Sequence, residues 1–365
     1  MILDEKERGW TGWTGLGRWM VLALVLSSSI LGSFWMLAQP HQVAWVLSGK
    51  MNTEEKCGPR LLVIGAQKGG TTSLYKYLKR FDWIGVGRTK ELHFFDKVYK
   101  AKRKTDTEND IRQLQIEYLQ NFGMEAVWLP GFMRNTTDTC TDYRTKVTYC
   151  CQNRDIVFAD VTPRYMIIPE APELAEQITN DPWILALIRE PAARAVSHFR
   201  MEFRWDDEEV HRHNSTLFAE EFHKRVQRGI KVSRRCLTYP VTEECRRRGM
   251  EHDADFVWRG VYSIHLEPWF TQFGKEKLIL WISENFARDP ASHLVELQDV
   301  VMDGTLDRSS EQDYEKFNVD EKIVQPWNGT ITLLKEFYRE HNARLVELLS
   351  RWGYHTAAQD IEQLW

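Results

Sequence analysis

Residues 60–78 read RLLVIGAQKGGTTSLYKYL, and this stretch decides the expected fold. Arg60–Gly65 is a short apolar run that ends in glycine, which predicts a buried strand. Thr71–Arg80 has apolar residues at helical spacing and predicts a helix. The glycine-rich turn between them places backbone N–H groups at a helix N-terminus, where an anion can bind, and Lys68 adds a positive charge. An ordinary strand-to-helix turn is the alternative interpretation.

The turn does not match the Walker A motif, which needs a lysine directly after its second glycine. Gly65 and Gly70 have the spacing of that motif, but Thr71 stands where the lysine belongs. The sequence therefore disfavours a nucleoside-triphosphate kinase or a GTPase. The residues of the turn and the first helical turn that could contact an anion are Gly69, Gly70, Thr71, Thr72 and Ser73.

Further apolar runs alternate with helical patterns, which is typical of a parallel sheet covered by helices on both faces. We therefore expect a P-loop-like three-layer α/β fold, in which ligands bind at the carboxyl ends of the strands. The other predicted strands are 155–161, 183–188 and 277–283, and the helical patterns cover 110–122, 190–203, 217–229, 261–273 and 331–352.

Two further motifs lie where strands or extended segments end. The first is TKELHFFD at 89–96. In an extended segment Glu91 and His93 point to the same side, and a carboxylate or an imidazole facing an anion site is a candidate general base. The second is IREPAARAVS at 188–197, where Arg189 ends a strand and Ser197 follows on a helix. Arginine suits bidentate phosphate binding, although solvated or capping roles explain each of these residues when it is taken alone.

The N-terminal region contains a long apolar segment, Trp19–Ala38, and no charged residue lies between Arg18 and Lys50. Twenty helical residues span about 30 Å, the thickness of a bilayer core, so we expect a transmembrane signal-anchor. A cleavable signal peptide and a buried core helix are the alternatives. Basic residues are more frequent before the segment than after it, which predicts a cytosolic N-terminus. The expected divisions are a tail (1–18), the anchor (19–38), a short stem (39–59) and a lumenal domain (60–365).

A lumenal location agrees with three Asn-x-Ser/Thr sequons, at Asn135, Asn214 and Asn328. The lumen is oxidising, so the six cysteines are expected to pair, with 15 possible connectivities. Cys236 and Cys245 enclose a short polar loop and are the favoured pair. Cys140 with Cys150 or Cys151 comes second, and Cys57 is the remaining cysteine. A zinc site lacks its usual Cys-x2-Cys spacing, and a catalytic cysteine lacks supporting residues.

The composition of the chain is that of a globular protein. Its 365 residues are 43% hydrophobic and 27% charged, and the net charge is -4, which does not suggest nucleic-acid binding. No sequence cluster of metal ligands is visible, so no metal is expected. Local basic clusters at 100–104 and 246–248 are candidates for contact with an anionic glycan, although a solvated helix face is the other interpretation.

Taken together, GAQKGGTTSLYKYL, TKELHFFD and LIREPAARAVSHF resemble the Golgi membrane-bound sulfotransferases of the heparan sulfate type and their bacterial relatives. The later stretch RGVY at 259–262 and LILWISENFARDP at 278–290 match in the same order. The resemblance covers about residues 60–350. It implies transfer of a sulfuryl group from 3'-phosphoadenosine 5'-phosphosulfate (PAPS) to a hydroxyl of a glycosaminoglycan-like carbohydrate in the Golgi lumen, without a metal.

The resemblance also implies roles for individual residues. Lys68 and the Gly69–Ser73 turn would hold the 5'-phosphosulfate, with Lys68 stabilising the leaving phosphate during in-line transfer. Arg189 and Ser197 match the pair that binds the 3'-phosphate, and Tyr262 joins the donor-binding set. Glu91 matches the catalytic base. His93 matches an acceptor-site histidine and is the rival base.

Two departures from the family pattern concern the acceptor more than the donor. Val161 stands where heparan-type relatives often carry lysine, with Arg164 nearby as a possible replacement, and the segment 315–325 matches a late basic loop poorly. A tyrosylprotein or small-alcohol acceptor is therefore the alternative within the enzyme class. A catalytically silent glycan-binding membrane protein and a nucleotide kinase are the alternatives outside it. The oligomeric state has no signal in the sequence.

Overall fold

The protein is described here from a computed structural model. The structure describes residues 59–122, the backbone of 139–141 and 148–150, and residues 157–203, 215–237, 241–246, 255–302, 314 and 325–365, apart from residues 82, 88, 102, 104, 106, 180 and 243. These residues belong to one compact unit, Glu55–Trp365. The predicted tail, the apolar segment 19–38 and the stem up to residue 58 lie outside the described residues.

Within the described ranges, no helix combines the length and the apolar character that crossing a bilayer requires.

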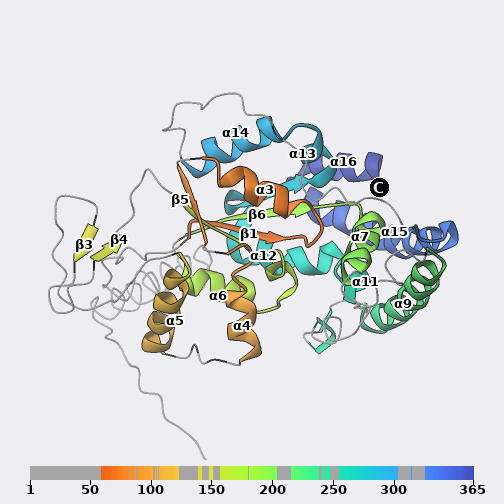
Figure 1. Cartoon of the computed structure of the whole chain (residues 1–365), viewed down its shortest axis with the longest axis horizontal. Coiled ribbons are helices and arrows are strands. Elements are labelled where there is room, and N and C mark those ends of the chain that lie inside the picture. Colours follow the sequence, from red (N-terminus) through yellow and green to blue (C-terminus); the bar gives the residue numbers. More distant parts are fainter. Residues whose placement is uncertain are drawn as a thin grey trace, which may run out of the picture. The chain divides into compact units, whose positions relative to one another are not determined.

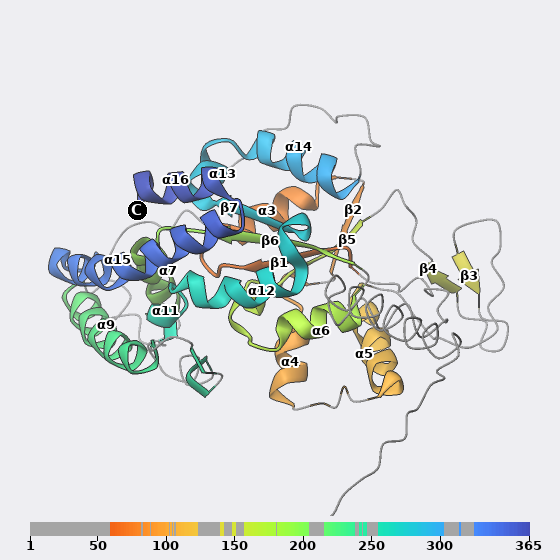
Figure 2. The ribbon, with the colours of Figure 1, turned by 180° about the vertical axis from the view of Figure 1, so that it is seen from behind.

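Five parallel strands form the central sheet, in the order β2-β5-β1-β6-β7 (Figures 1 and 2). β1 lies in the middle, with Leu61 opposite Ala159 on one side and Trp183 on the other. A separate antiparallel pair, β3 and β4, places Cys140 opposite Tyr149. The strands are β1 (Leu61–Gly65), β2 (Ile84–Val86), β3 (Thr139–Thr141), β4 (Thr148–Cys150), β5 (Val157–Val161), β6 (Trp183–Ile188) and β7 (Leu278–Ile282).

Helices cover both faces of the sheet, which confirms the predicted layered α/β architecture (Figures 1 and 2). The helices are α3 (Thr71–Leu78), α4 (Phe94–Lys100), α5 (Glu108–Gln120), η1 (Tyr165–Ile167), α6 (Ala171–Ile178), α7 (Pro191–Phe203), α9 (Ser215–Cys236), α11 (Asp255–Trp258), α12 (Tyr262–Lys277), α13 (Ser283–Arg288), α14 (Pro290–Val301), α15 (Asn328–Arg351) and α16 (His355–Leu364).

Alternation along β1 divides the core into two layers. Leu61 and Val63 point to one face, where they pack with residues of α3, α13 and α14. Leu62 and Ile64 point to the other face, where they pack with residues of α4, α5, α6 and α12. Both faces of a parallel sheet are therefore buried, which explains why the strands are continuous apolar runs.

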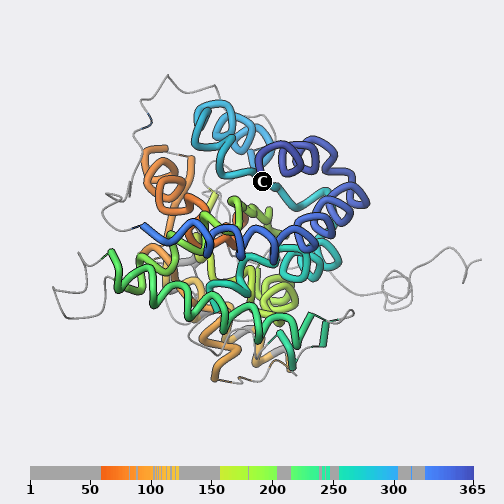
Figure 3. Tube along the Cα trace, turned by 90° about the vertical axis from the view of Figure 1, so that its right-hand side faces the viewer, coloured from red at the N-terminus to blue at the C-terminus, as the bar shows by residue number. Residues whose placement is uncertain are grey.

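A third cluster of buried apolar residues joins α7, α9, α11 and α15. Phenylalanines supply much of it, and Phe199 packs against Phe218, Phe222 and Phe256. Figure 3 shows α9 and α15 running across the face that this view presents. This helical layer lies beyond the carboxyl ends of the central strands, so it borders the edge at which ligands are expected.

The turn between β1 and α3 is closely packed against β6. Ala66 N–H donates to Leu187 O at 2.6 Å, and Gly69 N–H donates to Ala66 O at 2.9 Å. A Cβ atom added to Gly69 would lie 2.4 Å from Leu187 O, which is a backbone atom that cannot simply rotate away. Gly70 has φ 102°, in the left-handed region that glycine adopts without strain. Gly69 is therefore required for close packing against β6, and Gly70 for its backbone conformation.

Replacing Gly69 with alanine should destabilise the protein by about 1–3 kcal/mol, the usual cost of overpacking. Gly329 in the first turn of α15 is a matched control, since an added Cβ there meets no atom within 4 Å. Gly329→Ala should be neutral or slightly stabilising. Denaturant unfolding of both variants measures the difference, and equal effects would show that the turn has room to move.

Candidate active site

Three predicted site segments meet at neighbouring strand ends. The Lys68 turn follows β1, Arg189 follows β6, and the Glu91 segment docks at the end of β5, where Glu91 N–H donates to Val161 O at 3.2 Å. Because β5, β1 and β6 are adjacent in the sheet, the segments lie side by side although 121 residues separate Lys68 from Arg189. The carboxyl edge of the sheet is thus the candidate active site.

Backbone contacts hold the turn that contains Lys68. Arg189 Nη1 donates to Lys68 O at 3.4 Å, and Ser283 Oγ donates to Gly69 O at 2.6 Å. Tyr262 is buried, and its hydroxyl donates to Arg189 O at 2.8 Å. The structure therefore places the Tyr262 hydroxyl against the backbone of Arg189, and its role in donor binding stays a prediction.

The N-termini of α3 and α7 differ in how they are capped. No side chain caps α3 at Gly70, and its first turn contains no acidic residue. At α7, by contrast, Glu190 accepts from Ala192 N–H at 3.1 Å and from Ala193 N–H at 2.6 Å. The first-turn N–H groups of a helix have no intrahelical acceptor, so the N-terminus of α3 suits an anion.

The other residues predicted to contact the donor differ in how exposed they are. Thr71 is buried, whereas Thr72 and Ser73 are half-exposed in the first turn of α3. Ser197 is half-exposed on α7, the helix that follows Arg189. Thr72, Ser73 and Ser197 are therefore the partly exposed hydroxyl residues on this side.

The prediction of an extended segment around Glu91 and His93 is wrong. Both residues are left-handed, with φ 65° and 56°, and α4 begins at Phe94. The two side chains nevertheless meet, because the bend brings His93 Nε2 to 3.5 Å from Glu91 Oε2. A tight turn, not strand alternation, produces the proximity that the sequence suggested.

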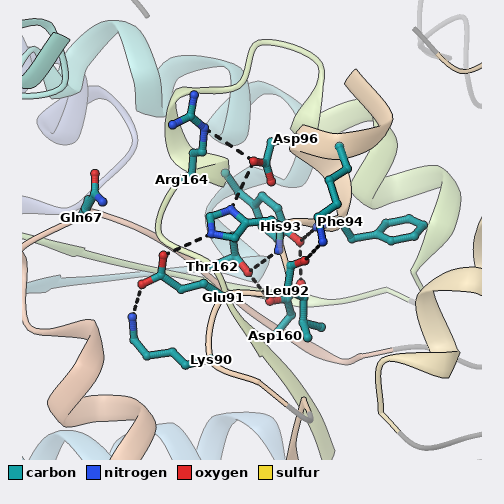
Figure 4. Close-up of polar contacts among 12 residues, drawn as sticks. Gln67, Lys90, Glu91, Leu92, His93, Phe94, Asp96, Asp160, Thr162 and Arg164 are labelled. Carbon is teal, nitrogen blue, oxygen red and sulfur yellow. Dashed lines mark hydrogen bonds and ion pairs between the residues drawn. The ribbon is translucent and has the colours of Figure 1, made fainter. Parts of the chain in front are cut away.

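A chain of polar side-chain contacts runs through this turn (Figure 4). Lys90 Nζ contacts Glu91 Oε1, and His93 lies between Glu91 and Asp96, with His93 Nδ1 at 3.2 Å from Asp96 Oδ2. Arg164 Nε lies 3.6 Å from the same Asp96 oxygen. Asp96 is buried, so it fixes the imidazole from behind and leaves the Glu91 carboxylate as the more accessible acid.

Asp160 supports the turn from the end of β5. Its carboxyl group accepts from Thr162 Oγ1 at 2.6 Å, from Tyr118 OH at 2.6 Å and from Tyr165 OH at 2.8 Å. Tyr165 OH also accepts from Phe94 N–H at 2.8 Å. Burial raises the pKa of Asp160, and the three hydroxyl donors oppose that rise. Through Tyr165, this buried carboxyl group fixes the start of α4.

Sequence reasoning named Glu91, His93 and Arg164 but missed Asp96, Asp160 and Tyr165 as functional support. The available signal for Asp160 was an acidic residue inside an apolar strand, since an unpaired buried charge is costly. Asp96 stood inside the quoted motif. Its position three residues after His93 on a helix would have suggested contact.

A second buried network lies beneath the Lys68 turn. Arg259 Nη1 donates to Gln67 Oε1, and Arg259 Nε donates to Asp255 Oδ2 at 2.9 Å. His198 Nε2 lies 3.2 Å from Glu202 Oε1. Burial, and then the charges of Arg259 and Arg194, lowers the pKa of His198 well below its usual value. Burial, and then Asp255, raises the pKa of Glu202 to about 7.

Three members of this network have the geometry of metal ligands. Ligand atoms of His198, Glu202 and Asp255 lie within 4.8 Å of one another. Both carboxyl groups already have an arginine as partner. Arg259 binds Asp255, and Arg225 Nη1 lies 3.9 Å from Glu202. We interpret the group as a buried ion-pair network that supports Gln67 and the turn.

The structure also contains predicted features outside the site. Cys236 and Cys245 form a disulfide. Asn328 is exposed at the first residue of α15, whereas Asn135 and Asn214 lie outside the described residues. The other cysteine pairings concern Cys57 and Cys151, which are not described, and Cys140 and Cys150, whose side chains are not described.

No profile of a known protein family matches the chain. Mouse heparan sulfate glucosamine 3-O-sulfotransferase 3A1 is 24% identical over 283 residues, covering 76% of this chain and 53% of the relative. Human carbohydrate sulfotransferase 15 is 22% identical over 317 residues, covering 81% and 54%. Carbohydrate sulfotransferase 15 of the squid Nototodarus sloanii is 30% identical over 142 residues, covering 36% of this chain and 89% of the relative.

The chain belongs to the sulfotransferase family of these relatives. It spans about half the length of the mouse and human proteins that it matches. Among solved structures, a sulfotransferase from Alicyclobacillus acidocaldarius aligns with 20% identity and a TM-score of 0.47, over 81% of this chain and 99% of that one.

Tyr165→Phe should destabilise the protein more than Tyr118→Phe. Both changes remove one hydroxyl from Asp160, but only Tyr165→Phe also leaves the Phe94 N–H without its acceptor. A buried unpaired N–H costs about 1–3 kcal/mol, which is the expected excess. Unfolding of the two single variants in denaturant measures it, and a larger loss for Tyr118→Phe would contradict the assigned role of Tyr165.

The pKa of Glu202 predicts a pH-dependent stability. Its folded-state pKa of about 7 lies above the ordinary value of 4.5, so its contribution is fully present below pH 4.5 and is lost as the pH rises through about 7. Glu202→Gln should remove this dependence. The free energy of unfolding of the native chain, relative to that of the variant, should therefore fall between these pH values. A constant difference would show that Glu202 does not titrate there.

Proposed function

We propose that this protein transfers a sulfuryl group from PAPS to a hydroxyl of an anionic glycan. The observation that carries the proposal is the meeting of Glu91, the Lys68 turn and Arg189 at adjacent strand ends. This places Glu91, a candidate base for the acceptor hydroxyl, next to the turn that could bind the charged donor. Membership of the sulfotransferase family supports the reaction class.

The donor side has the features that a phosphosulfate needs. The N-terminus of α3 has no side-chain cap and no acidic residue in its first turn, so its first-turn backbone amides can receive an anion. Lys68 and Arg189 add two cations at the same turn. Arginine suits a phosphate group that must be held in place, and the half-exposed Ser197 on α7 adds a hydroxyl.

The acceptor side supplies the base. As the acceptor oxygen bonds to sulfur, its proton passes to the Glu91 carboxylate, and the bond between sulfur and the phosphate oxygen breaks. Negative charge then builds on that phosphate oxygen, where Lys68 and the turn amides stabilise it. His93, held by Asp96 at 3.2 Å, orients Glu91 and keeps the carboxylate at the edge of the turn.

An anionic glycan fits the charges on the acceptor side. Lys90, Lys97, Lys100 and Arg164 lie on or beside the segment that carries Glu91, and Lys97 and Lys100 are exposed. Arg164 supplies a cation near the position where Val161 replaces the expected lysine. Carbohydrates appear in the names of the mouse, human and squid relatives, which supports a glycan acceptor.

We also propose that the protein works in the Golgi lumen, anchored by segment 19–38. The apolar segment, the three sequons and the basic bias before the segment support this location. The Cys236–Cys245 disulfide fits an oxidising compartment.

Incubation of the full chain with sulfur-labelled PAPS and a panel of glycans tests the proposal. We expect label on a sulfated or uronate-containing glycan, and loss of transfer in Lys68→Ala by about 100- to 1000-fold. Label on a tyrosine-containing peptide or a small alcohol would move the acceptor out of the glycan class. Donor binding without transfer to any acceptor would contradict the enzymatic proposal.

Glu91→Gln separates chemistry from binding. The amide preserves size but cannot accept the proton, so kcat should fall by at least about 100-fold while donor affinity stays near normal. His93→Asn is the comparison, because His93 would act through Glu91 and its loss should be milder. Steady-state kinetics and PAPS titration measure both. A Glu91→Gln enzyme with most of its kcat, beside a severely impaired His93→Asn, would transfer the base role to His93.

A further inference from the structure

The outer face of α9 carries a row of basic side chains outside the candidate active site. Lys224, Arg228, Lys231 and Arg235 are all exposed, and their spacing of four, three and four residues aligns them along one side of the helix. We call these four residues the basic stripe. We infer that the basic stripe is a docking surface for the chain of an anionic glycan, an inference that rests on the proposed function.

The stripe faces away from the protein. The buried residues of α9, among them Phe222, Val226 and Ser233, lie on the opposite side of the helix and pack in the cluster shared with α7, α11 and α15. From Lys224 to Arg235 the helix rises about 16 Å, at about 1.5 Å per residue. Figure 3 shows α9 crossing the face that this view presents, and the four side chains of the stripe are exposed there.

The second part of this helix, from residue 224 on, has basic residues only, whereas its first part contains Glu220 and Glu221. Residues 224–236 read KRVQRGIKVSRRC, with lysines and arginines but no acidic residue, in a chain whose net charge is -4. The neighbouring α15 is different, because its basic residues alternate with glutamates and Arg344 pairs with Glu340 at 2.7 Å. A solvated surface helix needs no such excess of one sign.

The arrangement costs helix stability, because like charges three or four residues apart repel one another. The helix dipole favours basic residues in the last turn, which accounts for Arg235, but it does not favour Lys224 and Arg228 in the middle. Arg225 on the flank is paired with Glu221 at 3.0 Å, and Glu220 lies four residues before Lys224 on the side of the stripe. A polyanion lying along the stripe would relieve the repulsion.

Contacts between α9 and the helices α7 and α11 connect the basic stripe to the proposed donor side of the site. Arg225 reaches Glu202 of α7, the helix that carries Ser197, and α9 packs against α11, the helix of Asp255. The disulfide between Cys236 and Cys245 holds the next residue, Arg246, beside the end of α9. A glycan held on α9 therefore stays close to the end of the sheet where transfer is proposed, which raises its local concentration there.

A membrane surface is the other macromolecule that basic helices bind, but α9 lacks the second requirement. Interfacial helices bury an apolar face in the lipid, whereas the apolar face of α9 is buried in the protein. Among the described residues, the large apolar side chains that are exposed are Trp327 and Leu364, and neither is on α9. A narrow charged row suits an extended polyanion.

The test compares two triple variants with the same change of charge. One is Lys224→Glu, Lys231→Glu and Arg235→Glu on α9, and the other is Lys335→Glu, Arg339→Glu and Arg351→Glu on exposed positions of α15. Each set has two positions within the helix and one in its last turn. Binding of long heparan sulfate chains is measured without PAPS, over a range of salt concentrations, beside a short oligosaccharide and anionic lipid vesicles.

The α9 variant should bind long chains at least about tenfold more weakly and with a shallower salt dependence, whereas the α15 variant should bind almost normally. Short-oligosaccharide and PAPS binding should change little in both. Equal losses in the two variants, no loss in either, or a loss confined to vesicles would overturn the inference. A glutamine version of the α9 set shows whether any loss comes from unfolding. Because binding is measured without transfer, failure of the proposed activity would appear separately.

Discussion

The buried carboxyl group of Asp160 makes the hydrogen bonds on which the proposed acceptor side of the site depends. Burial disfavours its charged form, and three hydroxyl groups donate to it in compensation. Two of these hydroxyls also accept hydrogen bonds from the backbone of the segment that carries Glu91 and His93. Thr162 Oγ1 accepts from His93 N–H at 3.5 Å, and Tyr165 OH accepts from Phe94 N–H at 2.8 Å. One buried acid thereby fixes the bend that brings Glu91 and His93 together.

The backbone at the site is held in unusual conformations. Among the described residues, four non-glycine residues have positive φ, and three of them are Lys68, Glu91 and His93. Such conformations are costly and persist where surrounding contacts impose them. Arg189 and Ser283 impose the turn after β1, and Thr162 and Tyr165 impose the turn before α4. The proposed donor and acceptor residues therefore stand on backbone fixed by the rest of the fold.

The parts of the fold that were predictable from the sequence are those decided by local pattern. The apolar runs of β1, β6 and β7 and the glycine turn before α3 have the boundaries that the pattern indicates, within one or two residues. The bend at Glu91 was not predictable in this way, because its determinants, Thr162 and Tyr165, are 69 and 71 residues away from their partners. The strand β2 has three residues, too few for a periodic signal.

The proposed donor and acceptor sides of the site are held by different sets of contacts. We expect this difference to decide which side can change without affecting the other. The proposed donor turn is held where side chains of Arg189, Ser283 and Tyr262 donate to backbone oxygens, and none of these three contacts involves a residue of the proposed acceptor side. The acceptor side is held by a chain of side chains, from Glu91 through His93 and Asp96 to Arg164. Changes such as Val161 for lysine can then alter acceptor contacts without disturbing the donor turn. A constant donor and a changing acceptor are the expected consequence of that division.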